Sequence, residues 1–151
     1  MATFTASIRA GNVARSVHTG VIAAHGRVTI SATGTAASKV LLVRLPDGAV
    51  VLDYLLYSST TAAADQTIEL GFSATPSALL AVHSLSASGS QEVSLLSIDG
   101  TRGQQSLLLP YRLSMSDSAQ PHWDWVIATY GAAISASALV SLTLFYTMEN
   151  V

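Results

Sequence analysis

The chain of 151 residues contains no cysteine and little charge. Without cysteine, disulfide bonds and thiolate chemistry are excluded, and the redox compartment cannot be inferred. Charged residues make up only 11% of the chain and hydrophobic residues 50%, and the mean hydropathy is +0.46. The surface of a soluble monomer normally carries more Lys, Glu, Asp and Arg. The scarcity of charge therefore favours a protein that covers much of its surface by assembling with neighbours.

Basic residues are too few and too scattered for a nucleic-acid partner. The seven Lys and Arg residues are spread from Arg9 to Arg112, and the net charge is −2. No cluster among them is dense enough to neutralise a run of phosphates. The N-terminal sequence also lacks an apolar core of signal-peptide length, so we expect no export by that route.

Catalytic and cofactor motifs are absent as well. The chain has no G-x-S-x-G, and no glycine-rich phosphate loop follows a strand and opens a helix. Among its four histidines, the only short spacing that suits a metal is His122-x-Asp124, for which a solvated loop is the simpler interpretation. Asp53 interrupts an apolar strand, and pairing with Arg44 or with a subunit neighbour explains this better than catalysis. We expect no catalytic residue, cofactor or metal.

Strand signals are what the chain has in abundance. Lys39–Leu45 and Ala49–Ser58 flank the sequence Leu45-Pro46-Asp47-Gly48, whose turn chemistry predicts a hairpin. Both faces of the second strand are apolar, which indicates a central position in its sheet. The two-residue alternation of strands predicts further ones. These are Gly26–Ala32, Asp65–Ser73, Glu92–Ile98, Ser106–Leu113, Trp123–Thr129 and Leu139–Met148.

Two segments fall outside the strand pattern. Thr75-Pro76 can cap and open a helix, so residues 76–82 are the one short helix that we expect. Residues 1–20 are extended and mildly polar, which predicts an N-terminal arm or edge strand. Residues 21–151 then form a single domain.

The uncharged stretch Val126–Met148 is long enough to span a membrane as a helix. From Leu139 onward, however, it alternates apolar with Ser and Thr positions, and only Phe145 breaks the polar side. Alternation of this kind is typical of a strand with one buried face. We therefore expect no membrane partner.

About eight or nine short strands at regular spacing predict an all-β protein. The expected fold is an antiparallel β-sandwich, specifically a jelly roll of about eight strands, with a lipocalin-type barrel as the alternative. Within it, Trp123 and Trp125 lie two residues apart and should project from one strand face. That face continues to Ile127, which favours burial or a subunit contact, while a sugar-binding surface is the alternative.

Three segments resemble the small structural proteins of tailed bacteriophages that serve as capsid decoration or cement proteins. They are LVRLPDGAVVLDYLLYSS, ADQTIELGFSATPSALLA and DWVIATYGAAISASALVSLTLFYTMEN, and the resemblance runs from about Gly26 to the end. It implies a jelly roll without enzymatic activity, forming a homotrimer on the capsid surface of the virion after synthesis in the bacterial cytoplasm. The implied partner is the major capsid protein.

On this hypothesis the protein binds and stabilises a capsid shell. The candidate residues for contact with the shell or with other subunits are Phe4, Ile8, Arg9, Arg15, Trp123 and Trp125. The arm could add a strand to an exposed edge of a neighbouring subunit. The alternatives are a collar, tail or fibre protein of the virion, and a carbohydrate-binding jelly roll that uses the two tryptophans.

Overall fold

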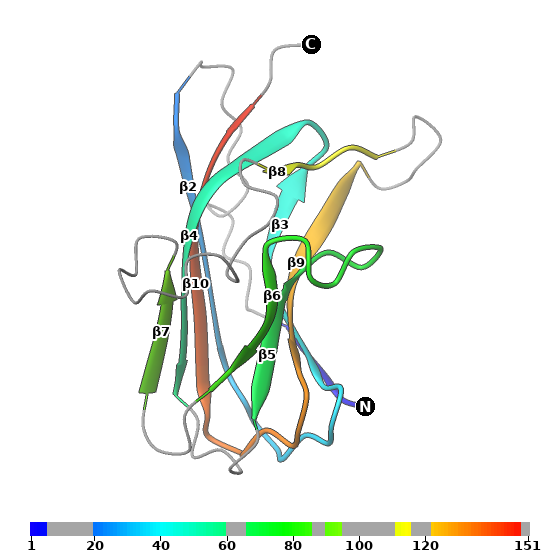
Figure 1. The fold of residues 1–151 in the computed structure, drawn as a ribbon, viewed down its shortest axis with the longest axis vertical. Coiled ribbons are helices and arrows are strands. Elements are labelled where there is room, and N and C mark those ends of the chain that lie inside the picture. Colours follow the sequence, from blue (N-terminus) through cyan, green and yellow to red (C-terminus); the bar gives the residue numbers. More distant parts are fainter. Residues whose placement is uncertain (6–19, 60–65, 86–89, 95–110, 116–121, 149–151) are drawn as a thin grey trace.

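Two five-stranded sheets pack face to face (Figure 1). The computed structural model describes residues 1–5, 20–59, 66–85, 90–94 (backbone only), 111–115 and 122–148. Sheet A has the strand order β1 (Thr3–Thr5), β3 (Lys39–Pro46), β9 (Trp123–Tyr130), β5 (Thr67–Gly71) and β6 (Leu80–Ser84). Sheet B has the order β2 (Ile22–Thr29), β10 (Leu139–Met148), β4 (Ala49–Ser59) and β7 (Ser90–Ser94), and the short β8 (Tyr111–Arg112) also pairs with β4.

The connections between these strands define a jelly roll. Most successive long strands lie in opposite sheets, with β5 and β6 as the exception. Sheet B contains β2, β4, β7 and β10, and sheet A contains β3, β5, β6 and β9. Every sheet partnership except that of β1 with β3 is antiparallel. The predicted sandwich is therefore confirmed, and the lipocalin-type barrel was wrong.

The predicted hairpin between residues 39–45 and 49–58 was wrong. The turn exists at Asp47 and Gly48, and Gly48 takes the positive φ of 79° that glycine tolerates. It carries the chain from β3 in sheet A to β4 in sheet B, because both strands find other partners. Two residues that follow β8 in the chain hold this corner by hydrogen bonds. The Gly48 amide donates to the Leu113 carbonyl at 2.9 Å, and the Met115 amide donates to Asp47 Oδ1 at 2.9 Å. The predicted central position of β4 is confirmed.

The predicted helix at residues 76–82 was also wrong. Residues 76–79 form a turn, and β6 begins at Leu80. The Leu79 amide donates to the Leu70 carbonyl at 2.9 Å, which pulls the chain back onto β5 after a single turn. Gly71 allows this, because a Cβ there would collide with the backbone of Thr75 and Pro76. Sheet pairing and the burial of three consecutive residues, 78–80, thus outweigh the local capping signal.

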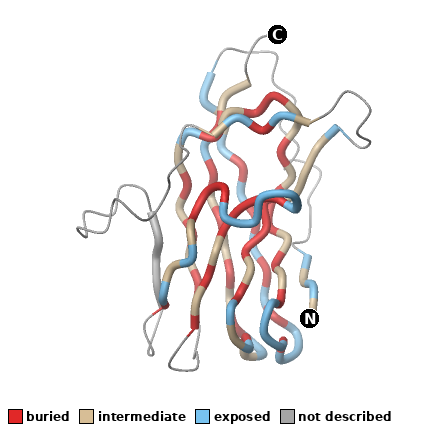
Figure 2. Tube along the Cα trace, turned by 45° about the vertical axis from the view of Figure 1, so that its right-hand side comes forward, coloured by how far each residue is buried: buried red, intermediate tan, exposed pale blue. Residues whose placement is uncertain are grey.

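The core lies between the two sheets. Buried side chains alternate with partly exposed ones along the strands, whereas the turns at one end are exposed (Figure 2). The Tyr130 hydroxyl of sheet A and the Ser58 hydroxyl of sheet B are 2.8 Å apart, which makes a buried hydrogen bond across the core. The largest fully buried side chains include those of Tyr54, Tyr130, Tyr146 and Phe72.

The predicted bounds and buried face of β10 are confirmed. Its bounds are Leu139–Met148, its inward positions are buried, and Phe145 stands out on the other face with 37% of its surface exposed. Among the described residues, no helix has the length and apolar character needed to cross a membrane.

Two equivalent corners join the sheets at the end of β2 and of β9. Gly34 and Ile134 form an isolated antiparallel bridge between these corners, and their backbones exchange hydrogen bonds of 2.9 and 3.2 Å. In each corner one residue without the freedom of glycine has positive φ: Ala37 at 61° and Ser137 at 69°. Such backbone conformations cost an L-residue about 1–2 kcal/mol.

Candidate protein-binding face on sheet A

The outer face of sheet A carries the aromatic residues that the sequence singled out. Along β9, Val126, Ala128 and Tyr130 point into the core and are fully buried. The alternate positions Trp123 and Trp125 therefore point outward, and both side chains are half-buried. The prediction that the two indoles share one strand face is confirmed.

A β-bulge in β3 brings an arginine to these indoles. The pairing of β3 with β9 shifts between Leu41 and Val43, so that both Leu42 and Val43 are buried. After the bulge, Arg44 lies opposite Trp125 and points outward with it. Re-aiming a side chain in this way is a common role of bulges.

Arg44 and the two indoles form a compact cluster. The guanidinium carbon lies 4.1 Å from the ring centroid of Trp123 and 4.8 Å from that of Trp125, within the range of cation–π attraction. The two rings meet edge to face at 86°, with centroids 6.1 Å apart. We call these three residues the Arg–Trp cluster.

The guanidinium of the cluster lacks a counter-charge in the described part of the chain. Arg44 Nε is buried and has no hydrogen-bond partner, and no carboxylate among the described residues forms an ion pair with this side chain. The predicted pairing of Arg44 with Asp53 was wrong, because these residues belong to different sheets. Asp53 Oδ1 instead accepts a 2.7 Å hydrogen bond from the Tyr54 amide.

The neighbouring carboxylate, that of Asp124, is engaged elsewhere. Its Oδ1 accepts the Trp125 amide at 2.7 Å, and its Oδ2 accepts the Ser73 hydroxyl at 3.2 Å. The His122-x-Asp124 spacing therefore brings no cluster of ligands with it. Within the described ranges, no group of three or more His, Cys, Asp or Glu side chains is placed to hold a metal ion.

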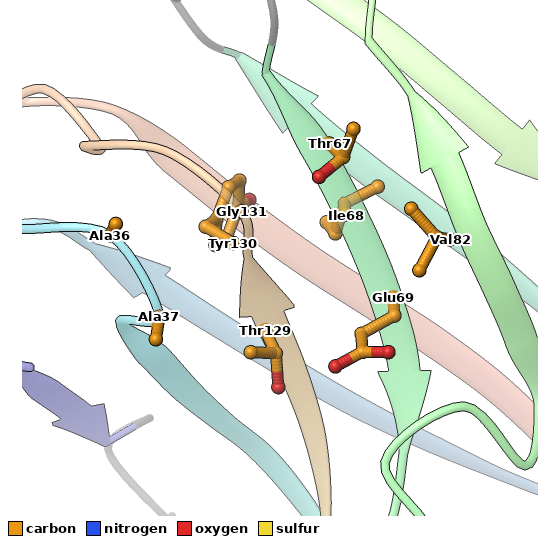
Figure 3. A pocket seen from close by; sticks show the side chains of 9 residues that line it. All are labelled: Ala36, Ala37, Thr67, Ile68, Glu69, Val82, Thr129, Tyr130 and Gly131. Carbon is orange, nitrogen blue, oxygen red and sulfur yellow. The ribbon is translucent and has the colours of Figure 1, made fainter.

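A partly open pocket of about 270 Å³ lies farther along the same face, near the corner that holds Ala37 (Figure 3). Glu69 on β5 and Thr129 on β9 are direct register partners there, and Val82 of β6 borders it with 65% of its surface exposed. The Tyr130 hydroxyl is turned away into the core, toward Ser58. The full lining is Ala36, Ala37, Thr67, Ile68, Glu69, Val82, Thr129, Tyr130 and Gly131. The lining thus combines one carboxylate with small and aliphatic side chains and two threonines.

Among the remaining candidate residues, the structure describes Phe4. Phe4 sits in β1, which pairs in parallel with β3, and its half-buried ring packs against the core. Ile8, Arg9 and Arg15 lie outside the described residues. The structure therefore brings Trp123 and Trp125 together and adds Arg44, which sequence reasoning had assigned to a different partner.

Comparisons with known proteins identify the fold. No protein-family model and no curated protein matches the chain. Five chains of solved structures do match it. A chain of the capsid of Ralstonia phage GP4 is 18% identical with a TM-score of 0.66, over 99% of this chain and 100% of that one. A chain of the cyanophage Pam1 capsid asymmetric unit is 19% identical with a TM-score of 0.61, over 94% of each chain. At these identities the likeness shows a shared fold.

Proposed function

We propose that the protein is a non-enzymatic structural component of a bacteriophage virion, and specifically a decoration or cement protein that binds and stabilises the capsid shell. The observation that carries this proposal is the fold match with a chain of the Ralstonia phage GP4 capsid, which spans essentially the whole of both chains. The low charge and the sequence resemblance point the same way.

The outer face of sheet A suits the binding step. Tryptophan and arginine are the residue types most enriched at the energetic centres of protein interfaces, and here three such side chains are packed together and half-buried. Low overall charge also reduces the desolvation cost of covering a large area. In this proposal the shell partner is the major capsid protein, the protein assembles as a homotrimer, and residues 1–20 act as an arm that contacts neighbouring subunits.

A carbohydrate-binding role is less well supported by the cluster. Sugar rings stack on open indole faces, whereas the Arg44 guanidinium lies over both indoles. A guanidinium over an indole competes with a sugar ring for the same face. The cluster is instead typical of a protein contact site.

The copy number of the chain in particles tests the proposal. Quantitative mass spectrometry of purified virions should give an abundance of the same order as that of the major capsid protein. A few copies per particle would assign the chain to a collar, tail or fibre instead. Its absence from particles would refute the virion role.

A further inference from the structure

Arg44 has no counter-charge among the described residues. We propose that the Arg–Trp cluster is a carboxylate-binding site, and that its ligand is an acidic side chain of the shell subunit on which the protein sits. This inference rests on the proposed function and names the chemistry by which the shell would be recognised.

The Arg44 guanidinium carries a buried donor that has no partner in the described part of the chain. Arg44 makes no hydrogen bond or ion pair with any described residue, and its Nε–H is buried without an acceptor. A buried donor without a partner costs about 1–3 kcal/mol. Groups held in this way concentrate at binding sites, where the surrounding structure fixes them in advance.

The Arg44 guanidinium is also held in one orientation. The β3 bulge and the two indoles hold the guanidinium plane in place, so that little side-chain entropy remains to be lost on binding. The terminal nitrogens of such a guanidinium form a planar fork that matches the two oxygens of a carboxylate. The two adjacent indoles would keep water away from that contact, which strengthens a charged hydrogen bond.

The distribution of charge favours a protein carboxylate over other anions as the ligand. A run of phosphates needs several cations side by side, and the seven basic residues of this chain are scattered along it. On the described outer face of sheet A, the other basic side chain is Lys39, which lies in the same row as Thr129 and Glu69 at the pocket end. A single forked donor with an aromatic rim fits one acidic side chain.

The test uses the full chain and empty shells assembled from the major capsid protein of the same phage, with binding measured by co-sedimentation. Arg44→Lys keeps the charge but removes the fork. Arg27→Lys is the matched control, because Arg27 is exposed on the outer face of sheet B. We expect Arg44→Lys to weaken binding about 30-fold or more, as for an interface hot spot, and Arg27→Lys to leave it unchanged within about twofold.

A second arm identifies the source of the carboxylate. Shells whose carboxylates have been blocked with a carbodiimide and ethanolamine should bind the wild type as weakly as untreated shells bind Arg44→Lys, and this arm needs no variant to fold. Equal binding of wild type and Arg44→Lys, or undiminished binding to blocked shells, would overturn the inference while leaving the proposed function intact. Failure of the wild type to bind shells at all would overturn both.

The tryptophans provide a readout that a merely structural role would not move. The chain has only two, and both belong to the cluster. With each quencher scaled to its effect on free tryptophan, iodide should quench their fluorescence more than caesium does in the free protein, because the adjacent cation attracts the anion. Shell binding should abolish this difference. If Arg44→Lys instead dissociates an oligomer of the free protein, the carboxylate belongs to a second copy and the shell assignment is wrong.

Discussion

The hydrogen bond between Tyr130 and Ser58 is the most informative place to perturb the fold. It joins the two sheets through a 2.8 Å contact, and the exposed surface of the two residues is 0% and 3%. Tyr130→Phe leaves the serine hydroxyl buried without a partner, and Ser58→Ala does the same to the phenol. Each orphaned group should cost about 1–3 kcal/mol.

The double variant distinguishes the bond from ordinary packing. Tyr130→Phe with Ser58→Ala removes both polar groups and leaves an apolar contact of similar shape, so its cost should be well below the sum of the two single costs. Urea denaturation, monitored by the fluorescence of Trp123 and Trp125, gives the free energy of unfolding of the wild type and the three variants. The m-value should be the same for all four proteins. A single cost of 2 kcal/mol would lower the Tm by about 4–8 °C in a domain of this size. Additivity within about 0.5 kcal/mol would refute the bond.

The same tyrosine makes a prediction at high pH. Burial raises the pKa of Tyr130 above its ordinary value of 10.0, and the hydrogen bond with Ser58 only partly offsets this. Below pH 10 the Tyr130 phenol is protonated in both the folded and the unfolded chain, so its contribution to the free energy of unfolding is complete. Between pH 10 and the folded-state pKa only the unfolded chain loses this proton, so the contribution is progressively lost. Stability should fall above pH 10, and Tyr130→Phe should reduce that slope by up to about 1.4 kcal/mol per pH unit. An unchanged slope in the variant would contradict the burial of the phenol.

Two backbone predictions follow from other places in the sandwich. A Cβ at Gly26 would collide with the backbone carbonyl of Leu42, so Gly26→Ala should destabilise by about 1–3 kcal/mol in urea, whereas Gly20→Ala, with nothing near its Cβ position, should be silent. Ala37 has a positive φ of 61°, which glycine adopts without strain, whereas Ala36 has no positive φ. The free energy of unfolding of Ala37→Gly should therefore exceed that of Ala36→Gly by about 1–2 kcal/mol. Equal values for the members of either pair would contradict the corresponding close approach or backbone conformation.

Strands were predictable from the sequence because burial of one face imposes alternation locally. The bounds of β10 and the shared face of Trp123 and Trp125 needed no knowledge of the rest of the chain. Pairing was not predictable in the same way. The Pro46-Asp47-Gly48 turn specifies local backbone angles, and these suit a hairpin and a corner between sheets equally well. Hydrogen bonds from Leu113 and Met115, more than sixty residues away, close the corner.

The role of Arg44 was hidden for a related reason. Its outward direction depends on the bulge next to Leu42 and Val43, and two consecutive apolar residues give no signal of where a bulge lies. Its contact with the indoles depends on the pairing of β3 with β9, which brings together residues about eighty positions apart. Only the full register reveals that the cation lies on the aromatic side of the sandwich.

The two outer faces of the sandwich differ in a way that bears on the proposed function. On sheet B, the outward side chains of β10 and its neighbours include the hydroxyls of Thr29, Ser141 and Thr143 and the partly exposed ring of Phe145. His25 Nδ1 lies 3.0 Å from the Thr143 hydroxyl. On sheet A, the outward side chains include two indoles and a cation that has no counter-charge among the described residues. The hydroxyls of sheet B are easily hydrated and surround a single large apolar ring, whereas the paired indoles of sheet A gain by being covered. The proposed binding to a shell should therefore use one face of the protein, and substitutions on sheet A should weaken it while those on sheet B leave it intact.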